Sequence, residues 1–503
     1  MKSMPSCLLV FPNQLFEDHP GLRLKPDRVV LIEDSLFFGD KKYPLNFHRK
    51  KLVFHRSAMK QYEAFCRKLG FETTYLEHEE REDSLLKHLQ FLQSNLLTGS
   101  IRLISLDAVD YELNRRLKKY VGELGMRISF LSNPGFINSR EENQEFFAER
   151  NSWRMIDFYK WQRTRLDVLM NAGSPLGGKW SFDQDNRKKV PRRLIDKIPQ
   201  DTLLTEGNWD LQACEHIANR YPDNPGLLSG GMYPTNHKQA ADWLDSFLEQ
   251  RFHHFGTYED AIVKGRNRLW HSVLSPLLNS GLLTPDQVLS RCLDYADEHE
   301  IPLNSLEGFV RQLIGWREFV RASYEEHGSS MRNANYWEHY REIPQAFYRL
   351  ETGIPPVDDC LRRIEETAYC HHIERLMVLG GFLFLCEVLP NRIYRWFMEM
   401  FIDSYDWVMV PNVFSMSQHA DGGLITTKPY FSGSSYIRRM SNYPKEDWCT
   451  TYDGLYWRWI WKNRKRLVQN PRWSMMCKLA EKMDRKKMET HLQRAEEYLS
   501  MIF

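Results

Sequence analysis

Short apolar runs alternate with amphipathic stretches over the first 135 residues of the chain. The stretches 47–70 and 111–125 carry apolar residues at helical spacing. The apolar runs between such stretches are CLLVF (7–11), VVLIE (29–33), FETTYLE (71–77), IRLISL (101–106) and MRISFL (126–131). Strands buried on both faces read as continuous apolar runs, and parallel strands need crossover helices. The pattern therefore predicts a doubly wound, parallel α/β domain over residues 1–135.

The pattern changes after residue 135. Residues 136–235 are polar and rich in Gly and Pro, which predicts a long interdomain connection with some helix. Residues 236–503 show helical spacing and no strand alternation of useful length, which predicts a larger, all-helical domain. The segment FPNQLF follows the first apolar run in place of a GxGxxG loop, so no standard dinucleotide site is expected there.

Composition and charge restrict the binding partners and the compartment that we expect for this protein. The chain has 68 Lys and Arg against 66 Asp and Glu, so a polyanion would have to meet a local basic patch. Trp, Tyr and Phe make up 13% of the residues, which fits either large helical cores or stacking on flat ligands. No two of the nine cysteines stand within four positions, and no apolar stretch is long enough for a signal peptide or a membrane span. We expect a cytoplasmic monomer in a reducing compartment, without a membrane partner.

Two segments of the helical region carry groups suited to a phosphate or a flat ring. Ser272 and Ser275 stand at an interrupted helix start, where hydroxyls and free N–H groups suit phosphate oxygens or merely cap the helix. In the segment 307–319, Gly315 allows close approach, Trp316 offers a flat face and Arg317 a cation. Ordinary helix packing explains the second segment equally well.

The adjacent histidines His371 and His372 are the sharpest single feature. On a helix they diverge by about 100°, and Leu376 occupies the position that a zinc-binding HExxH helix gives to its second histidine. A metal site is therefore disfavoured. A histidine at a pocket floor could donate a proton near pH 7, and a purely structural pair is the alternative.

Two later segments suggest a binding surface. Residues 401–430 hold many Asp, Asn, Ser and Gly, which predicts a loop beside the helical core. Residues 456–473 interleave four Trp with six basic residues and no acid. That composition fits nucleic-acid binding, and a solvated helix with its Trp side chains in the core fits it as well.

Seven blocks in order resemble the photolyase/cryptochrome superfamily over essentially the whole chain. They are HRKKLVFHRSAMKQYEAF, GGKWSFDQDNR, HFGTYEDA, GWREF, YCHHIERLM, MSQHADGG and KPY. The resemblance is to the prokaryotic (6-4) photolyase-related branch, which includes iron–sulfur bacterial cryptochromes and photolyases. It implies the photolyase fold, with an antenna domain followed by a helical domain that holds FAD in a U shape.

The resemblance also implies site residues. Met409 stands where the superfamily usually has Asn, Asp or Glu facing flavin N5, so a hydrogen bond to the ring is missing. The positions matching the FAD site are Tyr258, Ser272, Leu274, Ser275, Gln312, Trp316, Arg317, Arg375, Asp403, Met409 and Asn412.

HHIERL resembles the HHLARH element of animal (6-4) photolyases, which makes His372 the proton donor beside His371 and replaces the second functional histidine by Leu376. The remaining expected positions are Asp260 and Tyr430 for substrate, Trp396 and Tyr348 for electron transfer, Asn13 and Glu33 for the antenna, and Arg458, Lys462 and Arg464 for DNA. The implied antenna is a 6,7-dimethyl-8-ribityllumazine.

The cluster cysteines of this branch are incomplete. Pro356 stands near one expected ligand position and Pro444 lies in a shortened loop where a CxxC belongs, while Cys360 and Cys449 lie near ligand positions. A [4Fe–4S] cluster needs four ligands, so we expect no cluster and no other metal.

These features together predict a blue-light-driven photolyase that reverses pyrimidine(6-4)pyrimidone lesions in UV-damaged DNA, with the lesion flipped into the helical domain. A cryptochrome-like photoreceptor and a cyclobutane-dimer photolyase are the alternatives within the family. A non-enzymatic nucleic-acid-binding protein that uses residues 456–473 is the alternative outside it.

Overall fold

A computed structural model describes residues 5–79, 84–96, 102–148, 150, 153–201 and 204–503. Its N-terminal part is built on one five-stranded sheet in the order β3-β2-β1-β4-β5, with every neighbouring pair parallel. The strands are β1 (Ser6–Val10), β2 (Arg28–Ile32), β3 (Thr73–Leu76), β4 (Arg102–Leu106) and β5 (Arg127–Leu131). The predicted doubly wound α/β domain is confirmed, because each apolar run forms a strand of this sheet.

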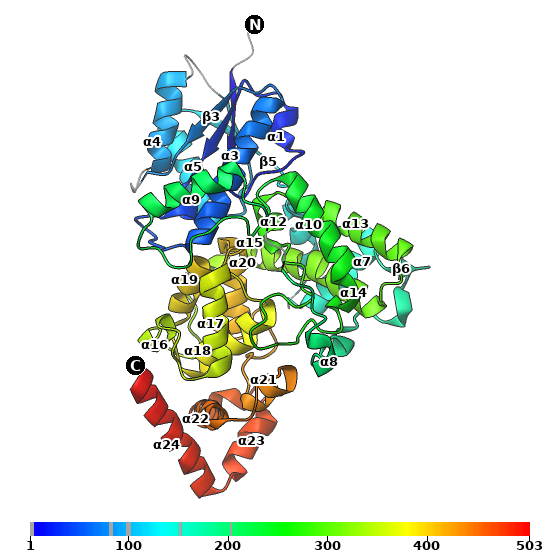
Figure 1. The fold of residues 1–503 in the computed structure, drawn as a ribbon, viewed down its shortest axis with the longest axis vertical. Coiled ribbons are helices and arrows are strands. Elements are labelled where there is room, and N and C mark those ends of the chain that lie inside the picture. The colour runs from blue at the N-terminus through cyan, green and yellow to red at the C-terminus, as the bar shows by residue number, and fades with distance from the viewer. Residues whose placement is uncertain (1–4, 80–83, 97–101, 149, 151–152, 202–203) are drawn as a thin grey trace.

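Helices cover both faces of the sheet (Figure 1). The longest, α3, has His48 at its N-cap, where the imidazole accepts a hydrogen bond from the Lys50 amide. At α5 the Asp110 carboxylate accepts from the Leu113 amide in the same way, which satisfies an otherwise unpaired N–H. The helical segments of this part are α1 (Pro20–Arg23), α2 (Ser35–Phe38), α3 (Arg49–Lys68), α4 (Ser84–Phe91), η1 (Leu92–Leu96) and α5 (Tyr111–Glu123).

The crevice at the reversal of strand order, between β1 and β4, is filled by the chain itself. Asn13 donates to the Ala108 carbonyl at 2.9 Å, and the Leu15 amide donates to the Ser280 carbonyl of the helical part at 2.9 Å. Gly281 follows with φ +88°, and its Cα lies so close to Leu15 that a side chain would meet the Leu15 nitrogen. These contacts tie the loop after β1 to the loop after β4 and to the helical part.

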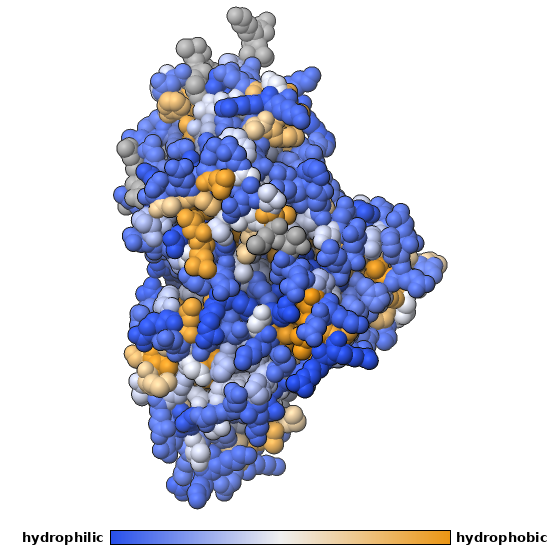
Figure 2. All heavy atoms as spheres, in the orientation of Figure 1, coloured by the Kyte–Doolittle hydropathy of each residue, from blue (hydrophilic) through white to orange (hydrophobic). Residues whose placement is uncertain are grey.

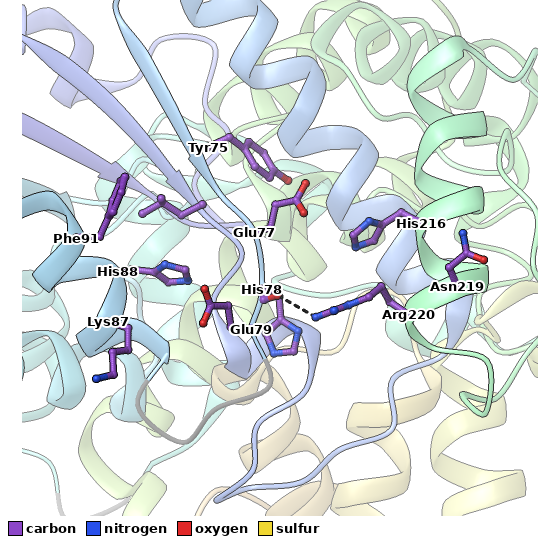
Figure 3. Close-up of a pocket in the computed structure, with 11 residues that line it drawn as sticks. Tyr75, Glu77, His78, Glu79, Lys87, His88, Phe91, His216, Asn219 and Arg220 are labelled. Carbon is purple, nitrogen blue, oxygen red and sulfur yellow. Dashed lines mark hydrogen bonds between the residues drawn. The ribbon is translucent and has the colours of Figure 1, made fainter. Parts of the chain in front are cut away.

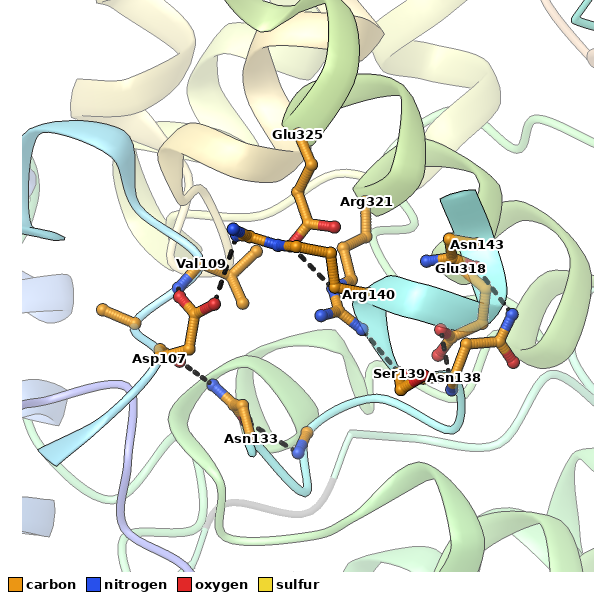
Figure 4. A network of polar contacts seen from close by, with 12 residues as sticks. Asp107, Val109, Asn133, Asn138, Ser139, Arg140, Asn143, Glu318, Arg321 and Glu325 are labelled. Carbon is orange, nitrogen blue, oxygen red and sulfur yellow. Dashed lines mark hydrogen bonds and ion pairs between the residues drawn. The ribbon is translucent and has the colours of Figure 1, made fainter. Parts of the chain in front are cut away.

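The segment between the two main parts is folded against both of them. Helix α9 packs against α3, and α7 packs against the helical domain. The elements are α6 (Arg140–Ala148), α7 (Met155–Leu166), the small hairpin β6 (Met170–Asn171) and β7 (Ser174–Pro175), η2 (Leu176–Gly178), η3 (Asp183–Asn186), α8 (Arg192–Ile195) and α9 (Asn208–Arg220). A polar clamp adds to this packing, because Arg140 lies 3.2 Å from both Asp107 after β4 and Glu325 of the helical domain (Figure 4).

From residue 236 onward the described chain is helical, as predicted, with isolated bridges but no named strand. Its last helices lie at the end of the molecule opposite the sheet (Figure 1). The elements are α10 (His237–Gln250), α11 (Phe252–Phe255), α12 (Ser275–Ser280), α13 (Pro285–Glu298), α14 (Leu303–Val310), η4 (Arg311–Trp316), α15 (Arg317–Arg332), α16 (Gln345–Tyr348), α17 (Pro355–Thr367), η5 (Glu374–Gly380), α18 (Gly381–Leu385), α19 (Pro390–Met400), α20 (Asp406–Val410), η6 (Pro411–Ser417), α21 (Ser434–Met440), α22 (Asp447–Leu467), α23 (Ser474–Lys482) and α24 (Arg485–Ile502).

One expectation for this region is wrong. Residues 406–417 form α20 and η6 instead of a loop, because Trp407, Val410 and Val413 are buried in the helical core. Their burial outweighs the turn-forming residues nearby.

The outer surface is mainly hydrophilic, and on the face in Figure 2 the apolar side chains form separate small patches. Among the helices of the described chain, none is long and apolar enough to cross a membrane.

Candidate functional site

Three π-helical segments carry predicted site residues. Gln312 and Trp316 lie in η4, Arg375 in η5 and Asn412 in η6. The segments η5 and η6 pack against each other. A π-turn inserts an extra residue into a helix and re-aims its side chains, and such turns occur frequently at functional sites.

Arg375 and Asp403 form a two-point ion pair. Arg375 Nη1 lies 2.8 Å from Asp403 Oδ1, and Nη2 lies 3.2 Å from Oδ2. The guanidinium also donates through Nε to the Cys370 carbonyl at 2.7 Å and lies 4.0 Å above the Phe401 ring. Parallel hydrogen bonds of this kind fix both groups in one plane, so the pair presents a rigid polar surface.

Asp403 connects further predicted residues. The Ser275 hydroxyl donates to Asp403 Oδ2 at 2.5 Å, and Asn279 donates to the Asp403 carbonyl at 2.9 Å. Arg317 in turn donates to Asn279 Oδ1 at 2.6 Å, and burial lowers the pKa of Arg317 to about 10. Sequence analysis missed Asn279, although its spacing of four from Ser275 places the two residues on one helix face.

The two histidines have different environments. His371 is 1% exposed, and its ring stacks on that of His271 with centroids 4.4 Å apart. The His372 side chain is exposed, yet the surrounding protein lowers the pKa of His372 to about 4, mainly by burial and further through Arg375. The shift favours the neutral imidazole, where the sequence suggested a donor titrating near neutrality.

A carboxylate that the sequence analysis did not single out, Glu259, binds the predicted site residue Gln312. Gln312 donates to Glu259 Oε1 at 2.6 Å, and Asn186 donates to Glu259 Oε2 at 3.0 Å. Burial raises the pKa of Glu259 to about 7 and that of the neighbouring Asp260 to about 6. The only available signal was the position of Glu259 beside Asp260 in the block HFGTYEDA.

Other predicted flavin positions lie nearby with local bonds of their own. Leu274 is buried and forms the N-cap of α12, and Ser272 accepts a hydrogen bond from Trp243 through its carbonyl. Met409 and Tyr258 are buried, whereas Asn412 is half-buried and donates to the Val408 carbonyl at 2.7 Å.

The aromatic contacts of Trp396 differ from the expected ones. Trp396 is buried, with its ring 4.9 Å from Phe347 and 5.7 Å from Phe401, the ring beneath Arg375. The neighbouring Tyr348 is 53% exposed, and its role in electron transfer stays a prediction. The ring of α16 that contacts Trp396 is that of Phe347.

The basic, Trp-rich segment begins within α22, where residues 458–460 are buried in the core, and becomes exposed toward its basic end. Trp459 is fully buried, and Arg458 is 8% exposed and ion-paired with Glu387 and Glu496. Lys462 also binds Glu387, at 2.7 Å. The expected DNA contact of Arg458 is corrected on this ground, because its side chain is buried and held by two acidic partners. The side chain of Lys462 is 57% exposed, so its DNA contact stays a prediction.

Arg464, the third expected DNA contact, lies 4.0 Å above the Trp461 ring. Another set of cations lies closer to the predicted substrate residues. The charges of Arg187 and Arg472 act on both Lys428 and Tyr430, and Arg187 lies 3.9 Å from Asp260. The cationic group Arg187, Lys428 and Arg472 thus flanks Tyr430 and Asp260.

In the sheet domain, Glu33 is buried within a dense polar network. It accepts hydrogen bonds from Tyr75 at 2.6 Å and the His78 amide at 3.0 Å, and pairs with Arg56 at 2.6 Å. Tyr75 and His78 also line a cavity of about 660 Å³ at the carboxyl end of β3 (Figure 3). The lining residues are Tyr75, Leu76, Glu77, His78, Glu79, Lys87, His88, Phe91, His216, Asn219 and Arg220. Asn13 is not among them, since it lies in the β1–β4 crevice.

All nine cysteines are free thiols. Cys360 is buried with Arg363 Nη2 3.2 Å from its sulfur, and Tyr443 donates to the adjacent Asp359 at 2.7 Å. Within the described ranges, no group of three or more His, Cys, Asp or Glu side chains is arranged to hold a metal ion.

Comparison with known proteins identifies the family. Residues 8–233 match the model of the deoxyribodipyrimidine photo-lyase-related protein, and residues 309–486 match the FAD binding domain of DNA photolyase. A (6-4) photolyase of Agrobacterium fabrum is 31% identical over 464 residues, which cover 90% of each chain. The chain therefore belongs to the photolyase-related branch of the photolyase/cryptochrome family, which has a role in DNA repair or light sensing.

Solved structures show the same fold at lower identity. A class III photolyase from Agrobacterium tumefaciens superposes with a TM-score of 0.58 at 16% identity, covering 88% of this chain and 87% of the other. A cryptochrome from Synechocystis sp. PCC6803 gives a TM-score of 0.59 at 15% identity and covers the full length of both chains.

The side chains of the helical site fit FAD, the cofactor of this domain family. Gln312, Trp316, Arg317 and Arg375 are only half-buried although the helices that carry them belong to the core. Their free surface supplies the cation, amide and flat ring that a flavin needs.

Proposed function

We propose that this protein is a photolyase that uses blue light to reverse pyrimidine(6-4)pyrimidone photoproducts in DNA. The observation that carries the proposal is the position of His372, an exposed histidine close enough to feel the charge of Arg375, which pairs with Asp403. We place the pocket for the flavin and the lesion, called the hollow below, at this point. The (6-4) photolyase to which the chain is 31% identical supports the choice of lesion.

FAD, when bound, supplies the photoexcited electron for repair. The residues of this site would bind the flavin, orient the lesion and protonate it. Arg375 and Asp403 hold the flavin side of the hollow through their fixed pair, and Arg317 is oriented through Asn279. His372 would give the proton to the lesion from its imidazolium form and be left as neutral imidazole. The negative charge that develops on the lesion would stabilise that imidazolium, against the burial and the Arg375 charge that lower the pKa of His372.

DNA approaches the side of the hollow that carries Asp260 and Tyr430. The cationic group Arg187, Lys428 and Arg472 flanks these residues and provides phosphate contacts. Burial lowers the pKa of Lys428, and the charges of Arg472 and Arg187 lower it further. The three cations repel one another, so a phosphate bound between them would relieve this repulsion.

For the sheet domain we propose an antenna chromophore in the cavity beside Glu33. Tyr75 and Phe91 supply aromatic surface, and Arg220 supplies a cation at the rim (Figure 3). Glu33 would act behind this wall by holding Tyr75 and the His78 backbone. A ribityllumazine, a planar heteroaromatic ring with a polyol tail, matches these groups. We further propose that no [4Fe–4S] cluster is present, since Pro356 and Pro444 occupy ligand positions.

The test is repair of defined oligonucleotides by the reduced holoprotein. One duplex carries a (6-4) product and another a cyclobutane dimer, and restored thymines are counted by chromatography after blue light and after darkness. Light-dependent repair of the (6-4) strand alone is expected. Repair of the dimer alone would contradict the assigned lesion, and no repair of either strand by the flavin-loaded protein would favour a photoreceptor.

A further inference from the structure

Arg268 is a buried cation that has no carboxylate partner among the residues described. It is 7% exposed, and none of its contacts there is an ion pair. The charge of Asp201 reaches it, but the Asp201 carboxylate pairs with Arg251 at 3.2 Å. Burial, together with the charge of Arg251, lowers the pKa of Arg268 to about 9. A buried charge is costly unless a counter-ion balances it, so Arg268 is suited to an anionic ligand.

Contacts with the protein hold the Arg268 guanidinium in one orientation. Its Nε donates to the His271 carbonyl and its Nη2 donates to the Ser272 carbonyl, both at 2.8 Å. The guanidinium also lies 4.4 Å from the centre of the Trp243 ring, whose Nε1 donates to the Ser272 carbonyl at 2.9 Å. The third nitrogen, Nη1, makes no hydrogen bond within the described chain and keeps some accessible surface. One edge of a fixed, charged fork is therefore available to a ligand.

A second buried arginine shows how a purely structural guanidinium differs from this one. Arg163 is fully buried, and all three of its guanidinium nitrogens donate to carbonyls of the protein. Its Nε reaches Val168 at 3.3 Å, its Nη1 reaches Trp180 at 3.1 Å, and its Nη2 reaches Leu169. Arg268 uses only two of its three nitrogens in this way, so packing alone does not account for its free edge.

The Arg268 guanidinium lies beside predicted flavin residues. Ser272, whose carbonyl it binds, is one of the positions that match the FAD site. Burial raises the pKa of Tyr369, and the charges of Arg375 and Arg268 both oppose this rise. The Tyr369 ring lies 5.2 Å from the Arg375 guanidinium. Arg268 and the Arg375–Asp403 pair therefore border the same part of the helical domain.

We propose that Arg268 binds the pyrophosphate of FAD through Nη1. A guanidinium donates its hydrogen bonds in a plane and stays charged at neutral pH, which suits a phosphate oxygen. This inference rests on the FAD cofactor of the domain family and not on the lesion that is repaired. A DNA phosphate is the weaker candidate, because a duplex meets exposed cations and Arg268 is 7% exposed.

The first test is phosphorus-31 NMR spectroscopy of the holoprotein, which detects the pyrophosphate of bound FAD directly. Arg268→Met removes the charge and the donors but keeps an unbranched side chain. We expect at least one phosphorus signal of the bound FAD to shift in this variant. Arg485→Met, at a 92% exposed side chain of α24, is the matched control and should leave both signals in place.

The second test measures the affinity for FAD, from flavin absorbance after dialysis of the holoprotein. We expect Arg268→Met to bind FAD about tenfold to hundredfold more weakly, as for the loss of a hydrogen bond to a charged group. Arg268→Lys keeps the cation, so it should recover part of this loss. Inorganic pyrophosphate, added in excess, should lower the flavin occupancy of the unmodified protein more than that of Arg268→Met.

The outcomes separate this inference from the repair function. Failure of the unmodified protein to repair either lesion would contradict the repair function alone, and the phosphorus signals would still decide the role of Arg268. Unshifted phosphorus signals in Arg268→Met would overturn the inference, whether or not flavin binding weakened. A slope of log DNA affinity against log salt reduced by about one would then assign the cation to a DNA phosphate. If Arg268→Met does not fold, Arg268→Lys decides the question, because the changed set of donors must still shift a phosphorus signal.

Discussion

The ammonium of Lys51, in α3 of the sheet domain, donates hydrogen bonds to the carbonyl and the hydroxyl of Ser404 at 2.7 and 2.8 Å. A third bond, at 3.0 Å, reaches the Met398 carbonyl at the C-terminal end of α19. Lys51 is 1% exposed, and burial lowers its pKa to about 7. Through Lys51 the sheet domain holds Ser404, the residue that follows Asp403. This contact links the two main parts of the molecule beside the Arg375–Asp403 pair.

Replacing Lys51 should therefore destabilise the molecule. Lys51→Met removes three hydrogen bonds while keeping the aliphatic volume, and leaves the buried Ser404 carbonyl unpaired. The Met398 carbonyl keeps its hydrogen bond from the Ser404 hydroxyl. We expect the free energy of unfolding to fall by about 2–4 kcal/mol, measured by urea denaturation. Lys68→Met, at the exposed end of the same helix, should change it by less than about 0.5 kcal/mol. Equal effects of the two variants would contradict the assigned role.

Removing the charge of Asp403 should weaken flavin binding. Asp403→Asn leaves Arg375 buried without its counter-ion and breaks the second hydrogen bond of the pair. A loss of about tenfold or more in FAD affinity is expected, measured by flavin absorbance after dialysis. Asp242→Asn, at an exposed position of α10, serves as the control. If Asp403→Asn retained all of its flavin, the Arg375–Asp403 ion pair would not contribute to flavin binding.

His372→Ala should lower the rate of (6-4) repair by a factor of about 100 or more, because the lesion loses its proton donor. Photoreduction of the bound flavin should persist, since Trp396 and its aromatic neighbours are untouched. Single-turnover repair and flavin absorbance under blue light measure the two properties. His253→Ala, at an exposed histidine, should repair normally, and repair by His372→Ala at the unmodified rate would exclude the donor role.

The two basic regions should respond differently to substitution. Arg472→Ala should weaken binding to any duplex and reduce the slope of log affinity against log salt by about one. Arg458→Ala should leave that slope unchanged but destabilise the fold, since it leaves Glu387 and Glu496 without this partner. A salt titration of both variants decides this, and a reduced slope in Arg458→Ala would restore α22 as a DNA contact.

Glu259 should make stability depend on pH. Burial raises the pKa of Glu259 from 4.5 to about 7, so the folded state holds this proton more tightly than the unfolded state. The associated stability is present below about pH 4.5 and is lost as the pH rises through 7. Relative to Glu259→Gln, the unmodified protein should lose about 1–3 kcal/mol of unfolding free energy between pH 5 and 8. Parallel pH dependence in denaturation of the two proteins would contradict this.

The sequence by itself determined the architecture. Apolar runs such as CLLVF can be satisfied only by burial on both faces, and the intervening amphipathic stretches supply helices to cover a parallel sheet. The order of the seven blocks determined the family, and Arg375 and Asp403 could be paired by resemblance before the structure showed their contact.

Tertiary structure decided which charges and rings are available. Arg458 and Lys462 lie in a basic run, yet Glu387 from another segment pairs with both, and no local pattern encodes that pairing. Helix direction turned Phe347 instead of Tyr348 toward Trp396. The contact of Glu259 with Gln312 joins residues 53 positions apart. A residue's type sets what it can donate or accept, but its burial and partners depend on distant segments that only the folded chain brings together.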